Sequence, residues 1–88
     1  MGKGLMSESE VTFHNNAKIK VQAQIFSGRT LVSTCLAAPG EVHVLPSTPA
    51  RYDIYLKNSV TGWELAHKLN SDATTITLSQ ENGRYVIV

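Results

Sequence analysis

The stretch Val11–Ile25 reads VTFHNNAKIKVQAQI, and its odd-numbered positions are almost all apolar. The apolar set is Val11, Phe13, Ala17, Ile19, Val21, Ala23 and Ile25. The even-numbered positions between them carry Thr, His, Asn, Lys and Gln. A period of two predicts strand, because successive side chains of a strand point to opposite faces of a sheet. A helix would need apolar residues spaced three and four apart, so the stretch indicates an all-β fold.

The pair Asn15-Asn16 interrupts this rhythm. It has two interpretations at the level of sequence. It marks a β-bulge within one long strand, or it splits the stretch into an outer piece and a longer piece over Lys18–Phe26. Both interpretations keep the fold class and differ only in the path of the chain.

The rest of the chain adds further short strand patterns separated by turn residues. They cover residues 30–36, 41–45, 50–57, 63–69, 74–81 and 84–88. The segment 30–36 is rich in apolar and β-branched residues, which predicts a strand covered on both faces. Pro46 and Pro49 exclude a central strand at that point and indicate a crossing or a sheet edge. Asn82-Gly83 predicts a type I′ hairpin turn.

Residues 63–69 are ambiguous. Thr61 and Glu64 fit a capping box, which would start a short helix. Trp63, Leu65, His67 and Leu69 also alternate with polar or small residues. We favour strand, because an isolated helix of two turns is marginal and the neighbouring segments are β.

Seven or eight short strands with turns between them predict a small antiparallel β-sandwich, and the alternative is a small, partly open, OB-like barrel. We expect residues 11–88 to form a single domain and residues 1–10 to be a flexible N-terminal lead-in. That lead-in has no apolar core of the kind a signal peptide carries. Because Cys35 is the one cysteine, no internal disulfide forms, and a cytoplasmic location is expected.

Charge and hydropathy argue against two classes of partner. Eight Lys and Arg against seven Asp and Glu give a formal net charge of +1. Nucleic-acid binders usually carry a clear basic excess, so we expect no nucleic-acid partner. No run approaches the ~20 apolar residues that span a bilayer, so no membrane partner is expected.

Cys35 and His43 are the one pair near in sequence that offers a nucleophile and a base. A four-residue loop over 37–40 would put them on opposite faces of a hairpin, and a three-residue loop would pair them directly. Neither arrangement supplies an obvious acid to orient the histidine. A small buried cysteine in a strand is the simpler interpretation, so we expect no catalytic residues and no enzyme.

The three histidines are His14, His43 and His67, and none lies at short ligand spacing from another. Metal sites in small domains usually show such spacing. We therefore expect no metal site and no cofactor.

A binding site is the more serious candidate. The residues that suggest it are Arg51, Asp53, Tyr55, Asn58 and Trp63. An aromatic ring beside acidic, amide and guanidinium groups suits a sugar ring, and a sandwich presents such groups at its loops. The simpler interpretation for Trp63, which we favour, is packing in the core. For Tyr55 the two interpretations are evenly balanced, because its neighbours on the same face are charged.

The C-terminal segment Tyr85–Val88 is apolar and lacks a charged residue that would discourage pairing. An exposed strand of this kind invites another strand, so it is either central in its sheet or covered by a partner. The leading hypothesis is therefore a non-enzymatic interaction or assembly module, with a protein partner or a homo-oligomer. The alternative is a lectin-like domain that binds carbohydrate or another small ligand.

Overall fold

The structure, a computed structural model, describes residues 9–88, and these form eight strands and no helix. The strands are β1 (Ser9–Asn16), β2 (Val21–Ser27), β3 (Thr30–Ala37), β4 (Val42–Thr48), β5 (Tyr52–Asn58), β6 (Glu64–Ser71), β7 (Thr75–Glu81) and β8 (Arg84–Ile87). Most of the predicted lead-in, residues 1–8, lies outside the described residues. Ser9 and Glu10 already belong to β1, so the first strand begins earlier than predicted.

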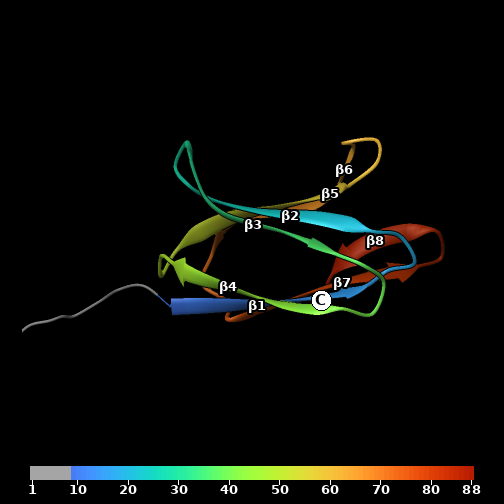
Figure 1. The fold of residues 1–88 in the computed structure, drawn as a ribbon, viewed down its shortest axis with the longest axis horizontal. Coiled ribbons are helices and arrows are strands. Elements are labelled where there is room, and N and C mark those ends of the chain that lie inside the picture. Colours follow the sequence, from blue (N-terminus) through green and yellow to red (C-terminus); the bar gives the residue numbers. More distant parts are fainter. Residues whose placement is uncertain (1–8) are drawn as a thin grey trace, which may run out of the picture.

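The strands form two stacked four-stranded sheets (Figure 1). Sheet A has the order β4-β1-β7-β8, and sheet B has the order β3-β2-β5-β6. Within residues 9–88 no strand of one sheet pairs with a strand of the other, so the alternative of a small barrel is not formed. The predicted β-sandwich is confirmed. Its description as antiparallel fails at one place, because β1 and β7 run parallel.

The stretch that suggested the fold is split between the two sheets. Residues 17–20 carry the chain across, so the interpretation of Asn15-Asn16 as a division is correct. Asn15 is fully buried, and its Nδ2 donates to the carbonyl oxygens of Ile19 and Ala37 at 2.9 Å each. Its Oδ1 accepts a hydrogen bond from the Ala17 N–H at 3.0 Å. The Asn15 amide therefore replaces ladder bonds where the backbone leaves sheet A.

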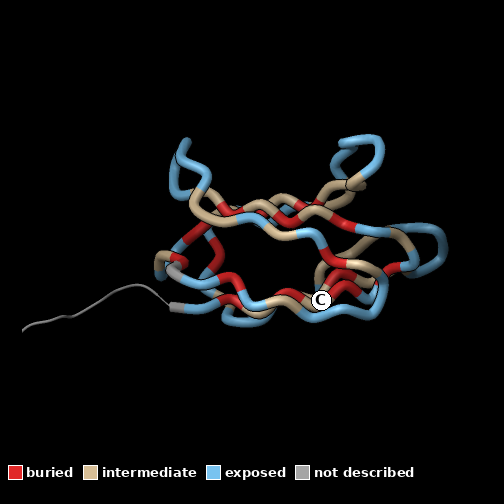
Figure 2. Tube along the Cα trace, in the orientation of Figure 1, coloured by how far each residue is buried: buried red, intermediate tan, exposed pale blue. Residues whose placement is uncertain are grey.

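The core lies between the sheets, where the inward positions of both meet (Figure 2). Its residues are Val11, Phe13, Ala17, Val21, Ala23, Ile25, Ala37, Leu45, Tyr52, Ile54, Leu56, Ile76 and Leu78. Phe13 lies opposite His43 on β4 and Ile76 on β7, and is fully buried. Inward positions recur at every second residue, as the alternation predicted.

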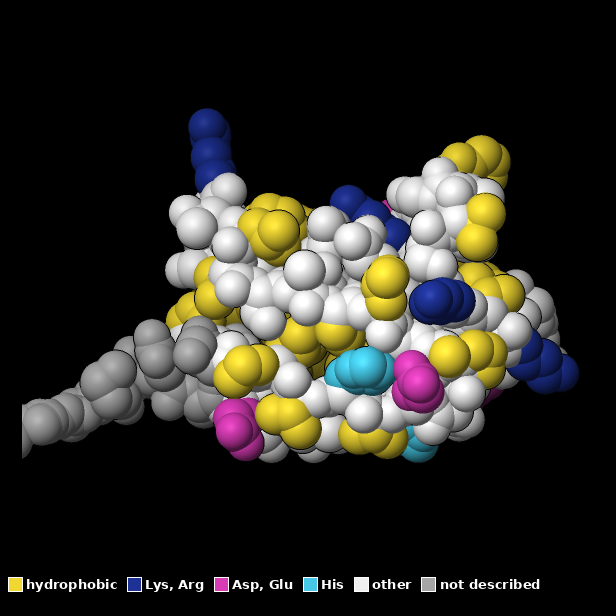
Figure 3. Space-filling view, viewed as in Figure 1, with side chains coloured by type: hydrophobic (Ala, Val, Ile, Leu, Met, Phe, Trp, Pro, Cys, Tyr) yellow, Lys and Arg dark blue, Asp and Glu magenta, His cyan; other side chains and the backbone are white. Residues whose placement is uncertain are grey.

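Two edge strands differ from expectation. β3 is an edge of sheet B and carries the exposed side chains of Leu31 and Leu36, so the prediction that both its faces are covered is wrong. β4 is an edge of sheet A, as its prolines indicated, but it continues through Pro46 to Thr48. An edge strand tolerates proline because one side of its ladder is empty. In Figure 3, apolar side chains lie exposed over β3 and β4.

The structure of β6 and of the β7–β8 turn agrees with the predictions from sequence. β6 is a strand, so the short helix is not formed. Asn82 and Gly83 both have positive φ, 51° and 77°, which is the conformation of a type I′ turn. This turn places β8 beside β7 at the edge of sheet A.

Candidate functional site

The five predicted binding residues do not form one site. Asp53 and Tyr55 lie on β5, Arg51 precedes this strand, and Asn58 ends it. Five residues of extended chain separate Asp53 from Asn58, which is about 17 Å. Trp63 belongs to the loop beyond Asn58, whereas Arg51 lies beyond Asp53 at the opposite end of the sheet. One sugar ring cannot contact both ends.

The side chains of two of these residues, Asp53 and Asn58, accept hydrogen bonds from backbone N–H groups. Asp53 Oδ1 accepts a hydrogen bond from the Asn70 N–H at 2.8 Å, where Asn70 has a positive φ of 52°. Asn58 Oδ1 accepts from the N–H groups of Val60 and Thr61 at 2.8 and 3.2 Å. The Asn58 bonds are the local side-chain-to-backbone bonds that Asn typically makes in turns, whereas the Asp53 bond joins β5 to β6. Their carboxylate and amide oxygens thus have structural roles.

Arg51 and Trp63 are both exposed. Arg51 Nη2 lies 3.8 Å from Asp72 Oδ2, with both side chains mostly in solvent, so this ion pair contributes little. The Trp63 side chain is 77% exposed, and the interpretation of this residue as part of the core is wrong. Its position in the β5–β6 loop explains this, because that loop projects from sheet B on the side away from sheet A (Figure 1).

Tyr55 is the one residue of the predicted set at the centre of a concave surface. It points outward from sheet B, because its neighbours Ile54 and Leu56 are buried. Its ring meets Phe26 edge-to-face at 5.6 Å between centroids, and His67 lies 5.7 Å away on its other side. A trough of about 340 Å³ crosses this surface. Its lining residues are Phe26, Gly28, Arg29, Tyr55, Lys57 and Glu64.

The sequence analysis missed most residues of this trough. One signal was available: Phe26 is an aromatic residue at an even position of a stretch whose other even positions are polar. An aromatic residue on the outer face of a sheet is either covered by neighbouring side chains or contributes to a binding surface. Arg29 and Glu64 gave no comparable signal, because Arg29 is brought toward Tyr55 by the long-range pairing of β2 with β5, and Glu64 by the register of the β5–β6 hairpin.

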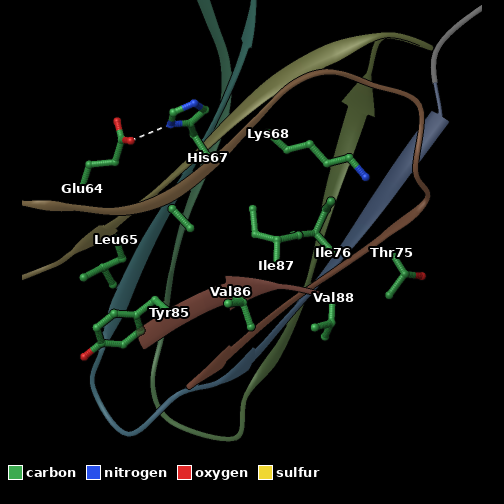
Figure 4. Close-up of a pocket in the computed structure, with 11 residues that line it drawn as sticks. Glu64, Leu65, His67, Lys68, Thr75, Ile76, Tyr85, Val86, Ile87 and Val88 are labelled. Atoms are coloured by element: carbon green, nitrogen blue, oxygen red, sulfur yellow. Dashed lines mark hydrogen bonds and ion pairs between the residues drawn. The ribbon is translucent and has the colours of Figure 1, made fainter. Parts of the chain in front are cut away.

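A second concave surface lies between the free edges of β6 and β8. It is a groove of about 560 Å³ (Figure 4). Leu65 and Lys68 project from β6, and Ile87 and Val88 line the opposite side. The groove is largely apolar on the β8 side, where Tyr85 and Ile87 pack against the core.

The edge of β8 leaves backbone groups without partners among residues 9–88. The Val88 N–H donates to the Thr77 carbonyl at 2.9 Å, which shows that even-numbered residues of this segment face β7. In an antiparallel pair, bonded and non-bonded residues alternate. The N–H and C=O groups of Tyr85 and Ile87 therefore point away from β7. In the described part of the chain no strand forms ladder hydrogen bonds with β8 on that side, and β6 lies beside it only across the groove.

Cys35 and His43 do not form the hairpin that their spacing suggested. β3 pairs with β2, whereas β4 pairs with β1 in the other sheet. The His43 ring nitrogen Nε2 lies 3.0 Å from Glu41 Oε1. Burial raises the pKa of the Cys35 thiol above its ordinary value, and a backbone hydrogen bond at Ala23 offsets this only partly. A raised pKa lowers the thiolate fraction, which is the opposite of what a nucleophile needs.

The three histidines lie on different strands. His14 is on β1 in sheet A, His43 on β4 and His67 on β6 in sheet B. Within residues 9–88 no three His, Cys, Asp or Glu side chains come together as a metal site would require. The same residues contain no helix of the length and apolarity needed to cross a membrane.

The arrangement defines an all-β chain of two packed sheets with two concave surfaces. Comparison with protein-family models, with curated proteins and with solved structures finds no match.

Proposed function

We propose that this chain is a non-enzymatic assembly module that pairs with a second copy of itself through the edge of β8. The observation that carries the proposal is the row of outward backbone groups at Tyr85 and Ile87, on a strand with apolar side chains from Tyr85 onward. An edge of this kind is a template for another strand, and natural proteins usually block it with charge or proline.

The geometry of β8 suits pairing with an identical strand. In an antiparallel pair related by a two-fold axis at Val86, Tyr85 of one copy lies opposite Ile87 of the other. Each then exchanges its outward N–H and C=O with its partner, so every outward group forms a hydrogen bond. A two-fold contact is also the commonest form of self-association, since one surface patch serves both copies.

The side chains support the same register. Val86 lies opposite Ser79 on β7, so it points to the outer face of sheet A and would meet Val86 of the second copy. Arg84 would lie opposite Val88, so the two arginines do not face each other across the axis. The β6 edge lies beside β8 along the groove and adds contact area. Because β8 is short, we expect a dissociation constant on the order of micromolar or weaker.

The test compares two valine substitutions on opposite edges of sheet A. Val86→Lys places like charges against each other at the two-fold axis, and Val44→Lys places the same charge on the exposed face of β4. Light scattering over a concentration series should give twice 9.6 kDa for the wild type and for Val44→Lys. Val86→Lys should remain at 9.6 kDa, with association weakened on the order of 100-fold or more.

Two results would overturn this assignment. One is a wild-type chain that stays monomeric up to the millimolar range. The other is equal weakening by both lysine variants, since that would place the contact elsewhere or reflect a general charge effect. Circular dichroism of each variant shows that the sheets are intact.

Hydrogen exchange on the unmodified chain gives a second measurement that needs no variant. The amides of Tyr85 and Ile87 should exchange rapidly in dilute solution and become protected as concentration rises. The Val86 amide faces β7 and should be protected throughout. Concentration-independent exchange at Tyr85 and Ile87 would contradict the proposed pairing.

A further inference from the structure

The trough at Tyr55, on the outer face of sheet B, carries an inference that does not depend on β8. The trough runs between two hairpins that project at opposite ends of this sheet, the β2–β3 turn and the β5–β6 loop (Figure 1). Phe26 and Tyr55 form its aromatic part. Arg29 comes from the β2–β3 turn, and Lys57 from the far end of β5.

The acidic side chain of the trough has a polar partner, whereas the two cationic side chains have no carboxylate partner among residues 9–88. Glu64 lies opposite Lys57 in the strand register, yet its Oε2 contacts His67 Nδ1 at 2.6 Å. In the described part of the chain, no carboxylate lies within 4 Å of the Arg29 or Lys57 side-chain nitrogens. Two cations without partners therefore flank an aromatic pair, while the one acidic group of the trough is engaged by histidine.

Two cations beside an aromatic pair indicate which chemical class of ligand the trough would bind. Cations without carboxylate partners attract an anionic group, and Arg in particular binds carboxylate or sulfate through paired N–H donors. Aromatic rings favour a ligand with an apolar flat side. The trough is shallow and open to solvent, so it would cover one side of a ligand and leave the other in water. A compact drug-like aromatic needs an enclosing pocket, whereas a saccharide keeps its hydroxyl groups hydrated.

We infer that the trough lined by Phe26, Arg29, Tyr55 and Lys57 binds an acidic saccharide, with separate sulfate or carboxylate groups at Arg29 and at Lys57 and a sugar ring on the aromatic pair between them. This differs from the site expected from sequence, because Arg51, Asp53, Asn58 and Trp63 take no part in it. Tyr55 alone is common to both.

The first experiment is an NMR titration of the full chain with a heparin-derived sulfated disaccharide, with lactose and inorganic sulfate as comparisons. The sulfated disaccharide should shift the amide signals of residues 26–29, 55–57 and 64–67. Its affinity should fall as salt is raised, because the cations are exposed. Lactose and inorganic sulfate should each bind at least 10-fold more weakly.

Arginine variants supply a matched control. Arg29→Gln removes a trough cation at one hairpin, and Arg84→Gln removes the same charge at the β7–β8 hairpin of the other sheet. Arg29→Gln and Lys57→Gln should each weaken binding about 5- to 10-fold, and Tyr55→Leu at least 10-fold. Arg84→Gln should leave the affinity unchanged, and so should Val86→Lys, which separates this site from assembly through β8.

The inference fails if the sulfated disaccharide shifts none of these signals at millimolar concentration. It also fails if inorganic sulfate binds equally well, because the trough would then hold an adventitious ion only. Equal binding of lactose would overturn the acidic part of the assignment. Equal weakening by Arg29→Gln and Arg84→Gln would show a general effect of charge.

Discussion

β4 and β8 are the two edges of the same sheet, and they are built differently. β4 contains Pro46, and Pro49 follows the strand closely. Its inward residue Leu45 is 1% exposed and belongs to the core. β8 contains no proline, and its inward residues Tyr85 and Ile87 are only partly buried.

The turns that lead into the two edges differ as well. Glu41 precedes β4 and binds both the Ala38 N–H, at 2.8 Å, and the His43 ring, at 3.0 Å. The two-residue turn before β8 relies on backbone conformation at Asn82 and Gly83. One edge is thus anchored and unsuited to pairing, whereas the other is lightly held and suited to it. This contrast is what the proposed pairing through β8 requires of the two edges.

The largest expected difference concerns packing beneath the two edges. Leu45→Ala should lower the free energy of unfolding by about 2–5 kcal/mol, because it leaves a cavity in a closed core. Ile87→Ala should cost about 1–2 kcal/mol in the monomer, since that side chain is only partly buried. Urea unfolding in dilute solution measures both. Equal losses would mean that β8 is anchored as firmly as β4.

A smaller effect is expected from two glycines that lead into these edges. Gly40 and Gly83 have positive φ of 84° and 77°, and an added Cβ would meet nothing within 4 Å at either. Alanine should therefore cost about 1–2 kcal/mol at each, from backbone conformation alone. Only Gly83→Ala should also weaken self-association, as measured by light scattering. If Gly40→Ala weakens it equally, the distinction between the two edges is wrong.

The smallest effect is pH-dependent and belongs to β4. Hydrogen bonds from His43 and from the Ala38 backbone hold the pKa of Glu41 below its ordinary value of 4.5. Because the folded-state pKa is lowered, these bonds stabilise the fold above pH 4.5. The stabilisation is lost as pH falls through the lowered value. The difference in stability between wild type and Glu41→Gln should thus be small at pH 7 and vanish in stronger acid. A difference that grows on acidification would contradict this.

Much of the fold could be predicted from sequence because alternation is a local signal. Tyr52, Ile54 and Leu56 alternate in the sequence and are buried together on β5. The path of the chain at Asn15 could not be predicted, because a bulge and a crossing both interrupt the pattern. The crossing is stabilised by hydrogen bonds between the Asn15 side chain and three backbone groups. One of these groups, the Ala37 carbonyl, lies 22 residues further along the chain, so sequence spacing does not reveal it.

The candidate site was harder to predict for the same reason. Tyr55 was identified from its own strand, where its charged neighbours indicated an outward face. Phe26 and Arg29 reach it through pairing between β2 and β5, which sequence spacing does not reveal. Asp53 and Asn58 accept hydrogen bonds from backbone N–H groups, and a polar side chain in such a structural role has the same composition signal as one that binds a ligand.

The parallel pairing of β1 with β7 has a consequence for biosynthesis. Thr12 pairs with Thr75, so sheet A joins segments from nearly opposite ends of the described chain, whereas sheet B contains the β2–β3 and β5–β6 hairpins. Contacts between distant segments form late and slowly. On the ribosome, β1 therefore lacks its β7 neighbour until residues 75–81 have emerged, whereas β2, β3 and β5 of sheet B, which cover its apolar face, emerge earlier. During that interval the unpaired edge of β1 is open to pairing with another chain, which favours aggregation.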